Sequence, residues 1–300
     1  MRPNFFWVTA VAALGLTAAA CGNTTDKAPT TATPLSAVTP ATTPPKAATS
    51  AAPAATASAA PADMPMQAGA EKMKVTITSP QSGTKVTDNS VTLQVAATGF
   101  DLTCDLAGKP VQEGKGHFHV EIDKSLVDMY CTTKATISLQ NVKPGKHTLE
   151  VLPAQNDHAE VHANAASIEI DYQPTKPLPE IKDATFAGKP SIKIVSPKAG
   201  DTVSGAFDVV VEVQNFNLSA DLFGKPGVAG YGHWHLNLDS TSGPMMGMGT
   251  MAGMSGTKTF KASTAGLKAG STHTLIALLV DNGHAPFPSD ISSKVEVKIK

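Results

Sequence analysis

Two His-aromatic-His triplets are the residues in this sequence whose types and spacing point most directly to metal chemistry. They occur in GHFHV at 116–120 and in GHWHL at 232–236, in a chain of 300 residues that has nine histidines. In a β-strand, alternate residues share a face and lie about 7 Å apart at Cα, a separation that two imidazoles can close onto one ion. The alternation places Phe118 and Trp234 on the core face and the histidines on the polar face. The triplets therefore predict metal ligands at His117, His119, His233 and His235.

A third ligand for each pair must come from elsewhere in the chain. His158 and His284 follow the turn signals of NDHAE and NGHAP, where they are ligand candidates or turn neighbours with about equal weight. His147 and His273 open the strand-like runs HTLEVLP and HTLIALLV, a position that favours a structural role at a strand's rim. We include His158, His273 and His284 among the candidate ligands. His162 has no counterpart in the second half of the chain and is discounted.

A methionine-rich segment, SGPMMGMGTMAGMSG, supplies five of the ten methionines in the chain. Thioethers are soft, uncharged ligands that suit Cu(I). The interspersed glycines argue against a helix or strand that carries the methionines into a core. The segment is therefore either a copper ligand set or a flexible, apolar contact loop. The candidate copper ligands are Met245, Met246, Met248, Met251 and Met254.

The elements that position these residues come from an internal repeat. ITSPQSGTKV matches IVSPKAGDTV, and GFDLTCDLAGKP matches NFNLSADLFGKP, with His233 lying 116 residues after His117. His273 lies 126 residues after His147, so the second copy has ten extra residues, in the region of the methionines. The repeat predicts two domains, 73–171 and 191–300, joined by a Pro-rich linker, 172–190.

Each copy contains about seven short alternating runs separated by turn signals, which is typical of an all-β chain with two tandem immunoglobulin-like β-sandwich domains. The SPxxGxxV entry resembles that of bacterial extracellular Ig-like domains. In the first copy the predicted strands are 73–78, 91–97, 100–106, 117–123, 135–139, 147–152 and 166–171.

The first residues predict export. Residues 1–21, MRPNFFWVTAVAALGLTAAAC, combine Arg2, an apolar run and small residues before Cys21, and they resemble the signal of a bacterial lipoprotein in which that cysteine is lipidated. The alternatives are an ordinary secretory signal or an uncleaved anchor. Residues 22–72 are rich in Ala, Thr, Pro and Ser and predict a disordered stalk. The expected location is extracytoplasmic, with a lipid anchor in the membrane of the bacterial cell envelope.

The other two cysteines, Cys104 and Cys131, are predicted to form a disulfide, since an exported protein folds in an oxidising compartment. The bridge closes a loop of about 27 residues and contributes about 3 kcal/mol. A cysteine-metal site is the less favoured alternative. Cys104 aligns with Ala220, so the second copy lacks this bridge.

A family resemblance rests on the Gly-His-x-His strand and on the later pattern HTLIALLVDNGHAP. These motifs resemble a family of small bacterial envelope domains of unknown function, which the second copy matches best. The resemblance implies an exported Ig-like module and no established chemistry.

The composition narrows the function further. A net charge of −1 with 16% charged residues excludes a basic surface for nucleic acid. No G-x-S-x-G, H-E-x-x-H, C-x-x-C or phosphate-binding glycine loop occurs, so we expect no enzyme. The favoured hypothesis is a lipid-anchored protein that binds copper, with zinc as the second candidate. The alternative is a structural or adhesive module that presents a surface to an envelope protein, a cell-wall polymer or a glycan.

Overall fold

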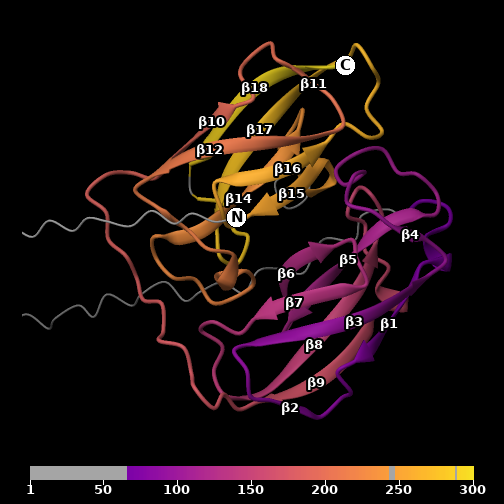
Figure 1. The fold of residues 1–300 in the computed structure, drawn as a ribbon, viewed down its shortest axis with the longest axis vertical. Coiled ribbons are helices and arrows are strands. Elements are labelled where there is room, and N and C mark those ends of the chain that lie inside the picture. Colours follow the sequence, from indigo (N-terminus) through magenta and orange to yellow (C-terminus); the bar gives the residue numbers. More distant parts are fainter. Residues whose placement is uncertain (1–65, 243–246, 288) are drawn as a thin grey trace, which may run out of the picture. The chain divides into compact units, whose positions relative to one another are not determined.

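The computed structural model describes residues 66–242, 247–287 and 289–300. These residues form two β-sandwiches, and every sheet draws its strands from one half of the chain only (Figure 1). The predicted all-β fold with tandem immunoglobulin-like sandwiches is confirmed. The predicted signal, residues 1–21, and most of the predicted stalk lie outside the described residues.

The first half contains nine strands in two sheets. Strands β1, β3 and β7 form one sheet, and the other contains β2, β9, β8, β5 and β4 in that order, with β6 also paired to β5. Both sheets supply the core, for example through Leu93 of β3 and Phe118 of β5. The strands are β1 (Lys74–Ser79), β2 (Thr84–Val86), β3 (Ser90–Thr98), β4 (Asp101–Leu102), β5 (Lys115–Ile122), β6 (Ser125–Tyr130), β7 (Lys134–Ser138), β8 (Gly145–Ala154) and β9 (Ala166–Tyr172).

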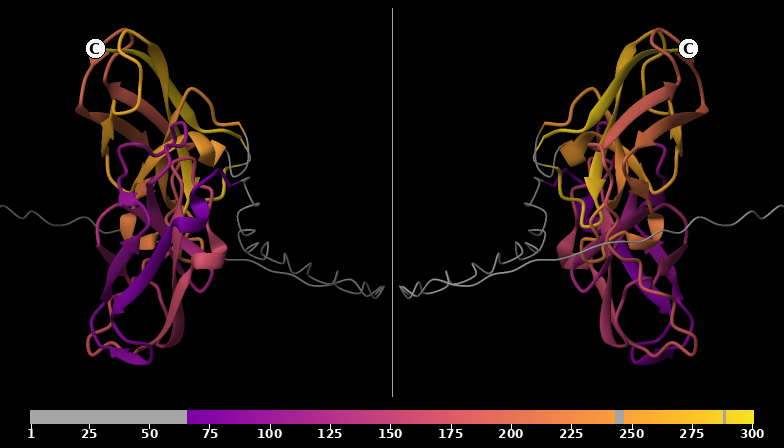
Figure 2. Two further views of the ribbon diagram at one scale, coloured as in Figure 1. Left: turned by 90° about the vertical axis from the view of Figure 1, so that its right-hand side faces the viewer. Right: turned by 90° about the vertical axis from the view of Figure 1, so that its left-hand side faces the viewer.

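The second half repeats this arrangement (Figure 2). Strands β10, β12 and β16 form the smaller sheet, and the larger contains β11, β18, β17, β14 and β13, with β15 paired to β14. Its strands are β10 (Ser191–Ser196), β11 (Thr202–Val203), β12 (Ala206–Gln214), β13 (Asn217–Leu218), β14 (Tyr231–Leu238), β15 (Met251–Ser255), β16 (Thr259–Ser263), β17 (Thr272–Asp281) and β18 (Ser292–Ile299). The 3-10 helices of the described chain are η1 (Ala70–Lys72), η2 (His162–Asn164), η3 (Ala220–Leu222) and η4 (Met248–Thr250).

One predicted strand is wrong. Of residues 100–106, only Asp101 and Leu102 pair in the sheet, and the chain then turns through Gly108 with a φ of 71°. A disulfide joins Cys104 in this turn to Cys131 at the end of β6, which confirms the predicted bridge. The equivalent strand of the second half, Asn217–Leu218, is equally short although it has no disulfide, so the turn itself ends the strand.

The extra residues of the second copy lie mainly in one hairpin. Strands β5 and β6 are joined by Asp123 and Lys124, both at positive φ, as a tight two-residue hairpin requires. The chain takes five residues from Glu121 to its partner Leu126, and fourteen from the equivalent Asn237 to its partner Met251. Nine of the ten extra residues therefore lengthen the hairpin between β14 and β15.

The prediction that glycines keep the methionine segment out of regular, buried structure is wrong. Met251 and Met254 belong to strand β15, and both are buried, as is Met248 of η4. Gly253 fits into the strand because the Phe260 ring covers it, and a Cβ there would lie 2.4 Å from that ring. Met245 and Met246 lie outside the described residues.

The described residues all belong to one compact unit, and the two halves contact each other through equivalent segments. A Cβ on Gly108 would lie 2.6 Å from backbone atoms of Thr250 and Met251, and one on the equivalent Gly224 would lie 2.5 Å from the carbonyl oxygen of Leu126. Each glycine of the two Gly-Lys-Pro motifs thus packs on the strand that follows the hairpin of the other half.

We expect Gly108→Ala to destabilise the chain more than Gly114→Ala. Both glycines have φ near 70°, so an alanine costs about 1 kcal/mol in backbone strain at either site. Only Gly108 lies against a backbone, whereas a Cβ on Gly114 meets nothing within 4 Å. Urea unfolding of the two variants measures the difference. Equal losses of unfolding free energy would contradict the close contact at Gly108.

Candidate metal centre

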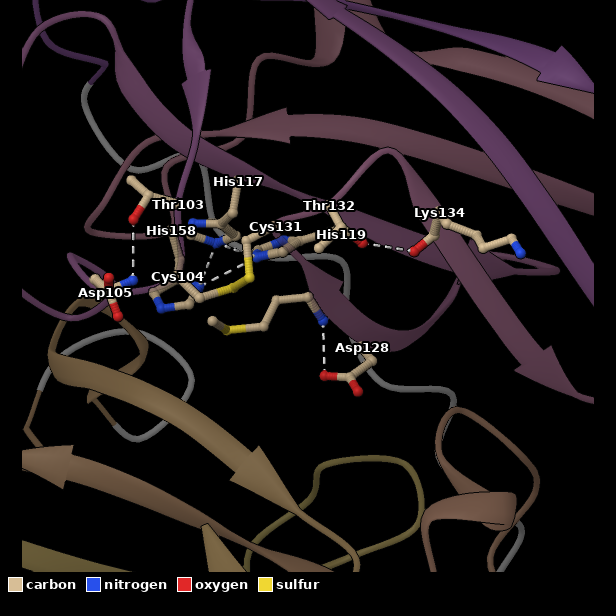
Figure 3. Close-up of a disulfide and its surroundings, with 11 residues drawn as sticks. Thr103, Cys104, Asp105, His117, His119, Asp128, Cys131, Thr132, Lys134 and His158 are labelled. Carbon is tan, nitrogen blue, oxygen red and sulfur yellow. Dashed lines mark hydrogen bonds between the residues drawn. A yellow bond between two sulfur atoms is a disulfide. The ribbon is translucent and has the colours of Figure 1, made fainter. Parts of the chain in front are cut away.

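Three histidines converge in the first half of the chain (Figure 3). His117 and His119 project from the same face of β5, and His158 comes from the turn after β8. The Nε2 atoms of His117 and His119 are 3.0 Å apart, and each lies 3.1 Å from Nδ1 of His158. Three ring nitrogens therefore form a nearly equilateral triangle.

The outer nitrogens of this triad fix where its protons are. His119 Nδ1 donates to Oε1 of Glu160 at 2.5 Å, and His158 Nε2 donates to the carbonyl oxygen of Met251 at 2.7 Å. In the neutral rings, the inner nitrogens of both histidines then carry lone pairs. At most one N–H, from His117, can serve these two acceptors, and His117 Nδ1 is buried without a hydrogen-bond partner. The metal-free triangle thus has more acceptors than donors.

A metal ion would satisfy the triangle. The edges of 3.0 and 3.1 Å put the three nitrogens about 1.8 Å from their common centre, so an ion about 2.0 Å from each nitrogen lies about 1 Å above their plane. Three imidazoles below an ion with a fourth position free is an arrangement that zinc and copper sites use.

The second half contains an equivalent triad of His233, His235 and His284. The distances are 3.1 Å between the Nε2 atoms of His233 and His235, and 2.9 and 3.3 Å from these atoms to Nδ1 of His284. His284 Nε2 donates to the carbonyl oxygen of Leu126 at 2.8 Å. The triangle of ring nitrogens is thus present in both copies, and in both the third histidine turns a lone pair inward.

Each triad has a hydrogen-bond partner in the other half of the chain. Leu126 and Met251 occupy equivalent places, because they pair with Glu121 and Asn237 of the two His strands. His158 bonds to the carbonyl of Met251, and His284 bonds to that of Leu126. The third imidazole of each site is therefore oriented by the partner half.

Burial lowers the pKa of five of the six triad histidines. Burial, followed by the neighbouring imidazoles, lowers the pKa of His117 and of His233 well below its usual value. Burial likewise lowers the pKa of His158 to about 3 and that of His284 to about 4. Neutral imidazole is the form that binds a metal, so these rings need no deprotonation at neutral pH.

The expectation that the His face of these strands is a polar surface is wrong. His117 and His233 are 0% exposed, and β5 and β14 are buried on both faces. Phe118 and Trp234 lie in the two cores, as the alternation predicts. The second face is covered because the turn with the third histidine and the other half of the chain close over it.

His273 does not join a triad, contrary to the prediction that it is a candidate ligand. Its Nδ1 lies 2.7 Å from Oδ2 of Asp239 at the end of β14, and its Nε2 lies 2.9 Å from Oγ of Ser271. His147 makes the equivalent bond to Asp123, at 2.6 Å. This pair links the start of β17, or of β8, to the neighbouring hairpin, which is the structural role that strand position favours.

Several residues that surround the triads are not predicted from the sequence. Glu160 holds His119, and its counterpart 126 residues later is Pro286. The register places Met129 directly opposite His119, and Met254 directly opposite His235. Opposite residues of antiparallel strands share a face, so each site has a thioether side chain beside its second histidine. These neighbours become apparent when β6 is aligned with β15. The uneven spacing of the repeat obscures that alignment in the sequence.

Comparisons with known proteins give the chain no family. No family model matches it, and no curated protein does either. Solved structures that overlap with it include fibronectin(III)-like modules of Clostridium thermocellum CbhA, at 12% identity over 75% of this chain and 94% of that chain with a TM-score of 0.24. A Dscam structure overlaps at 10% identity over 75% of this chain and 46% of its own, with a TM-score of 0.20. Bacteroides ovatus SGBP-B overlaps at 9% identity over 76% and 47%, with a TM-score of 0.22.

With TM-scores of 0.20 to 0.24, the similarity to these solved structures is too low to support an argument about the site or its ligand. The chain spans less than half the length of the Dscam and SGBP-B chains. Within the described part of the chain, no helix is long and apolar enough to cross a membrane.

We expect nitrogen NMR of the metal-free protein at pH 7 to show His158 as the neutral Nε2–H tautomer. The proton must lie on Nε2 because that atom donates to a carbonyl, which leaves Nδ1 with its lone pair inside the triangle. Long-range proton–nitrogen spectra distinguish the two nitrogens of each ring. An Nδ1–H signal or a protonated ring for His158 would contradict the inward lone pair.

Proposed function

We propose that this protein binds metal ions through the two His triads, with copper as the favoured ion and zinc as the second candidate. The observation that carries the proposal is the pair of ring-nitrogen triangles, each with edges near 3 Å and each buried. Imidazole is a ligand for both metals. The thioethers opposite His119 and His235 add a soft donor type, which favours copper.

Backbone strain at the third ligand supports the same function. His158 and His284 have φ of 66° and 64°, in the left-handed region that favours glycine. A side chain there costs about 1 kcal/mol or more and persists where the surroundings demand it. In both copies the strained residue is the histidine that completes the triangle. The cost is accounted for if the imidazole is required at that point.

The alternative is a non-catalytic structural or adhesive module. The sandwich fold by itself, without any bound metal, fits this alternative. In that case, the triads are buried polar networks of the interior, and the function lies on the outer surface facing an envelope protein or a glycan. The two hypotheses differ in one respect that can be measured: only the first expects bound metal. Neither includes a catalytic role.

The proposed setting of the site is the cell envelope. We infer export and lipidation at Cys21 from the sequence of residues 1–21, with the residues between Cys21 and η1 as a stalk that carries the sandwiches away from the membrane. The last three residues of the predicted stalk, Ala70–Lys72, form η1 instead, and Ala70 packs in the first core. The Cys104–Cys131 disulfide supports an oxidising compartment. We do not propose a separate copper site in the Met-rich segment, because three of its five methionines pack in the core.

The full-length chain is expected to retain two equivalents of Cu(I) after anaerobic equilibrium dialysis with ascorbate. His119→Gln and His235→Gln should each lose one equivalent, because each removes one corner of a triangle without adding charge. His273→Gln is the matched control and should retain two, since its ring bonds to Asp239. Elemental analysis gives the counts.

Wild-type protein that retains no copper and no zinc, with melting temperatures unmoved by either metal, would refute the metal-binding function. Circular dichroism of each variant confirms that a lost equivalent reflects a lost ligand and not a lost fold.

A further inference from the structure

The two triads share their ligands but differ in the charges around them. Three acidic residues of the first half, Glu160, Glu121 and Asp128, lie beside its triad. Glu160 bonds to His119 directly, Glu121 lies two residues after His119 on β5, and Asp128 lies opposite Val120 on β6. At the equivalent places the second half has Pro286, Asn237 and Gly253.

The carboxylate of Glu160 is part of the first site. Its side chain is 2% exposed and its Oε1 lies 2.5 Å from Nδ1 of His119, while Nε2 of the same ring points into the triangle. The short bond from the His119 N–H to Oε1 is of the kind that an ionised carboxylate accepts. A carboxylate behind a ligating imidazole makes the imidazole more basic and offsets the charge of the ion.

The second site has an apolar cover in place of this negative charge. The ring centroid of Phe223 lies 4.4 Å from that of His233 and 6.3 Å from that of His284. The equivalent residue in the first half is Ala107. Among the described residues, no carboxylate hydrogen-bonds to an imidazole of the second triad. Asp281, the nearest acidic residue in sequence to His284, accepts bonds from the amides of its own turn through Oδ1.

Charge then decides which ion each site prefers. A divalent ion on three neutral imidazoles leaves two positive charges in a buried site, and a buried charge without a partner is strongly unfavourable. Cu(I) leaves one positive charge in the site. This ion is stable at a low coordination number, with soft or nitrogen ligands in apolar surroundings. A divalent ion in the first site also leaves one positive charge, because the carboxylate of Glu160 offsets the other. The two loaded sites therefore carry the same net charge when the first holds a divalent ion and the second holds Cu(I).

We propose that the two sites select ions of different charge: the triad of His117, His119 and His158 takes a divalent cation, Zn(II) or Cu(II), and the triad of His233, His235 and His284 takes Cu(I). This inference rests on the proposed metal-binding function and adds the identity of each site's ion. Glu160 and Phe223 are the positioning and specificity-determining residues that separate the sites.

Single-site proteins test the proposal. His235→Gln leaves only the first site and His119→Gln leaves only the second. Each is titrated with Zn(II) against a colorimetric chelator, and separately with Cu(I) against an anaerobic chelator. We expect the first site to bind Zn(II) at least tenfold more tightly than the second, and the second to bind Cu(I) at least as tightly as the first.

Adding Glu160→Gln to the first-site protein isolates the role of the carboxylate. The amide oxygen can still accept the bond from His119, so the geometry is kept while the charge is removed. The Zn(II) affinity should fall about 10- to 100-fold, and the Cu(I) affinity should change much less. Glu169→Gln is the control, because that carboxylate pairs with Lys146 on the surface of the same half and should leave both affinities unchanged.

The outcomes distinguish failure of the ion selectivity from failure of the proposed metal-binding function. If both single-site proteins bind Zn(II) and Cu(I) with the same preference and Glu160→Gln changes neither, the charge selection is wrong while metal binding stands. If neither protein binds either ion, the metal-binding function itself fails, and the selectivity fails with it.

Discussion

Three imidazole nitrogens that face one another across about 3 Å, with one proton at most to share between them, form the constraint on which the rest of this structure depends. The arrangement cannot be relieved by protonation at neutral pH, because burial lowers the pKa of His117 and His158. Bulk water does not reach the rings either, since they are almost fully buried. The surrounding chain holds the rings in place through Glu160 and through the carbonyl of the other half. Such an unfavourable grouping of lone pairs makes sense as a preformed site for a cation.

The interface between the two halves is part of that site. In each direction, the carbonyl that orients the third histidine comes from the strand after the hairpin of the other half, and the Gly-Lys-Pro glycine packs against the same strand. Lys109 strengthens the contact by donating to the carbonyls of Ser263 and Ala265. The two copies therefore behave like the subunits of a dimer with equivalent contacts on both sides. Neither triad has a complete set of partners within its own half.

The disulfide and its counterpart show how the copies preserve this interface by different means. Cys104 and Cys131 join the Gly-Lys-Pro turn to the end of β6. At the equivalent positions, Ala220 and Gly256 approach so closely that a Cβ on Gly256 would lie 2.1 Å from the amide nitrogen of Ala220. One half uses a covalent bond and the other uses direct backbone packing, and both keep the turn against its strand.

The sequence predicts the pieces of the site that depend on local periodicity. Alternation in GHFHV places both histidines on one face, and the repeat marks His158 and His284 as candidates because duplicated turns precede them. It does not predict that these turns fold back over the His strands, since that follows from contacts distant in sequence. The burial of the methionines was missed for a related reason: Gly253 reads as a strand breaker until Phe260 is seen to cover it. Glu160 was missed because its partner His119 is 41 residues away in the chain.

Anomalous diffraction from crystals grown with copper or zinc tests the central claim most directly, because it locates the ion instead of inferring it from a variant. The account predicts one peak above each nitrogen triangle, about 2.0 to 2.1 Å from the three inner ring nitrogens. Peaks at the surface pairs of His147 with Asp123 or His273 with Asp239, with both triangles empty at saturating metal, would contradict it.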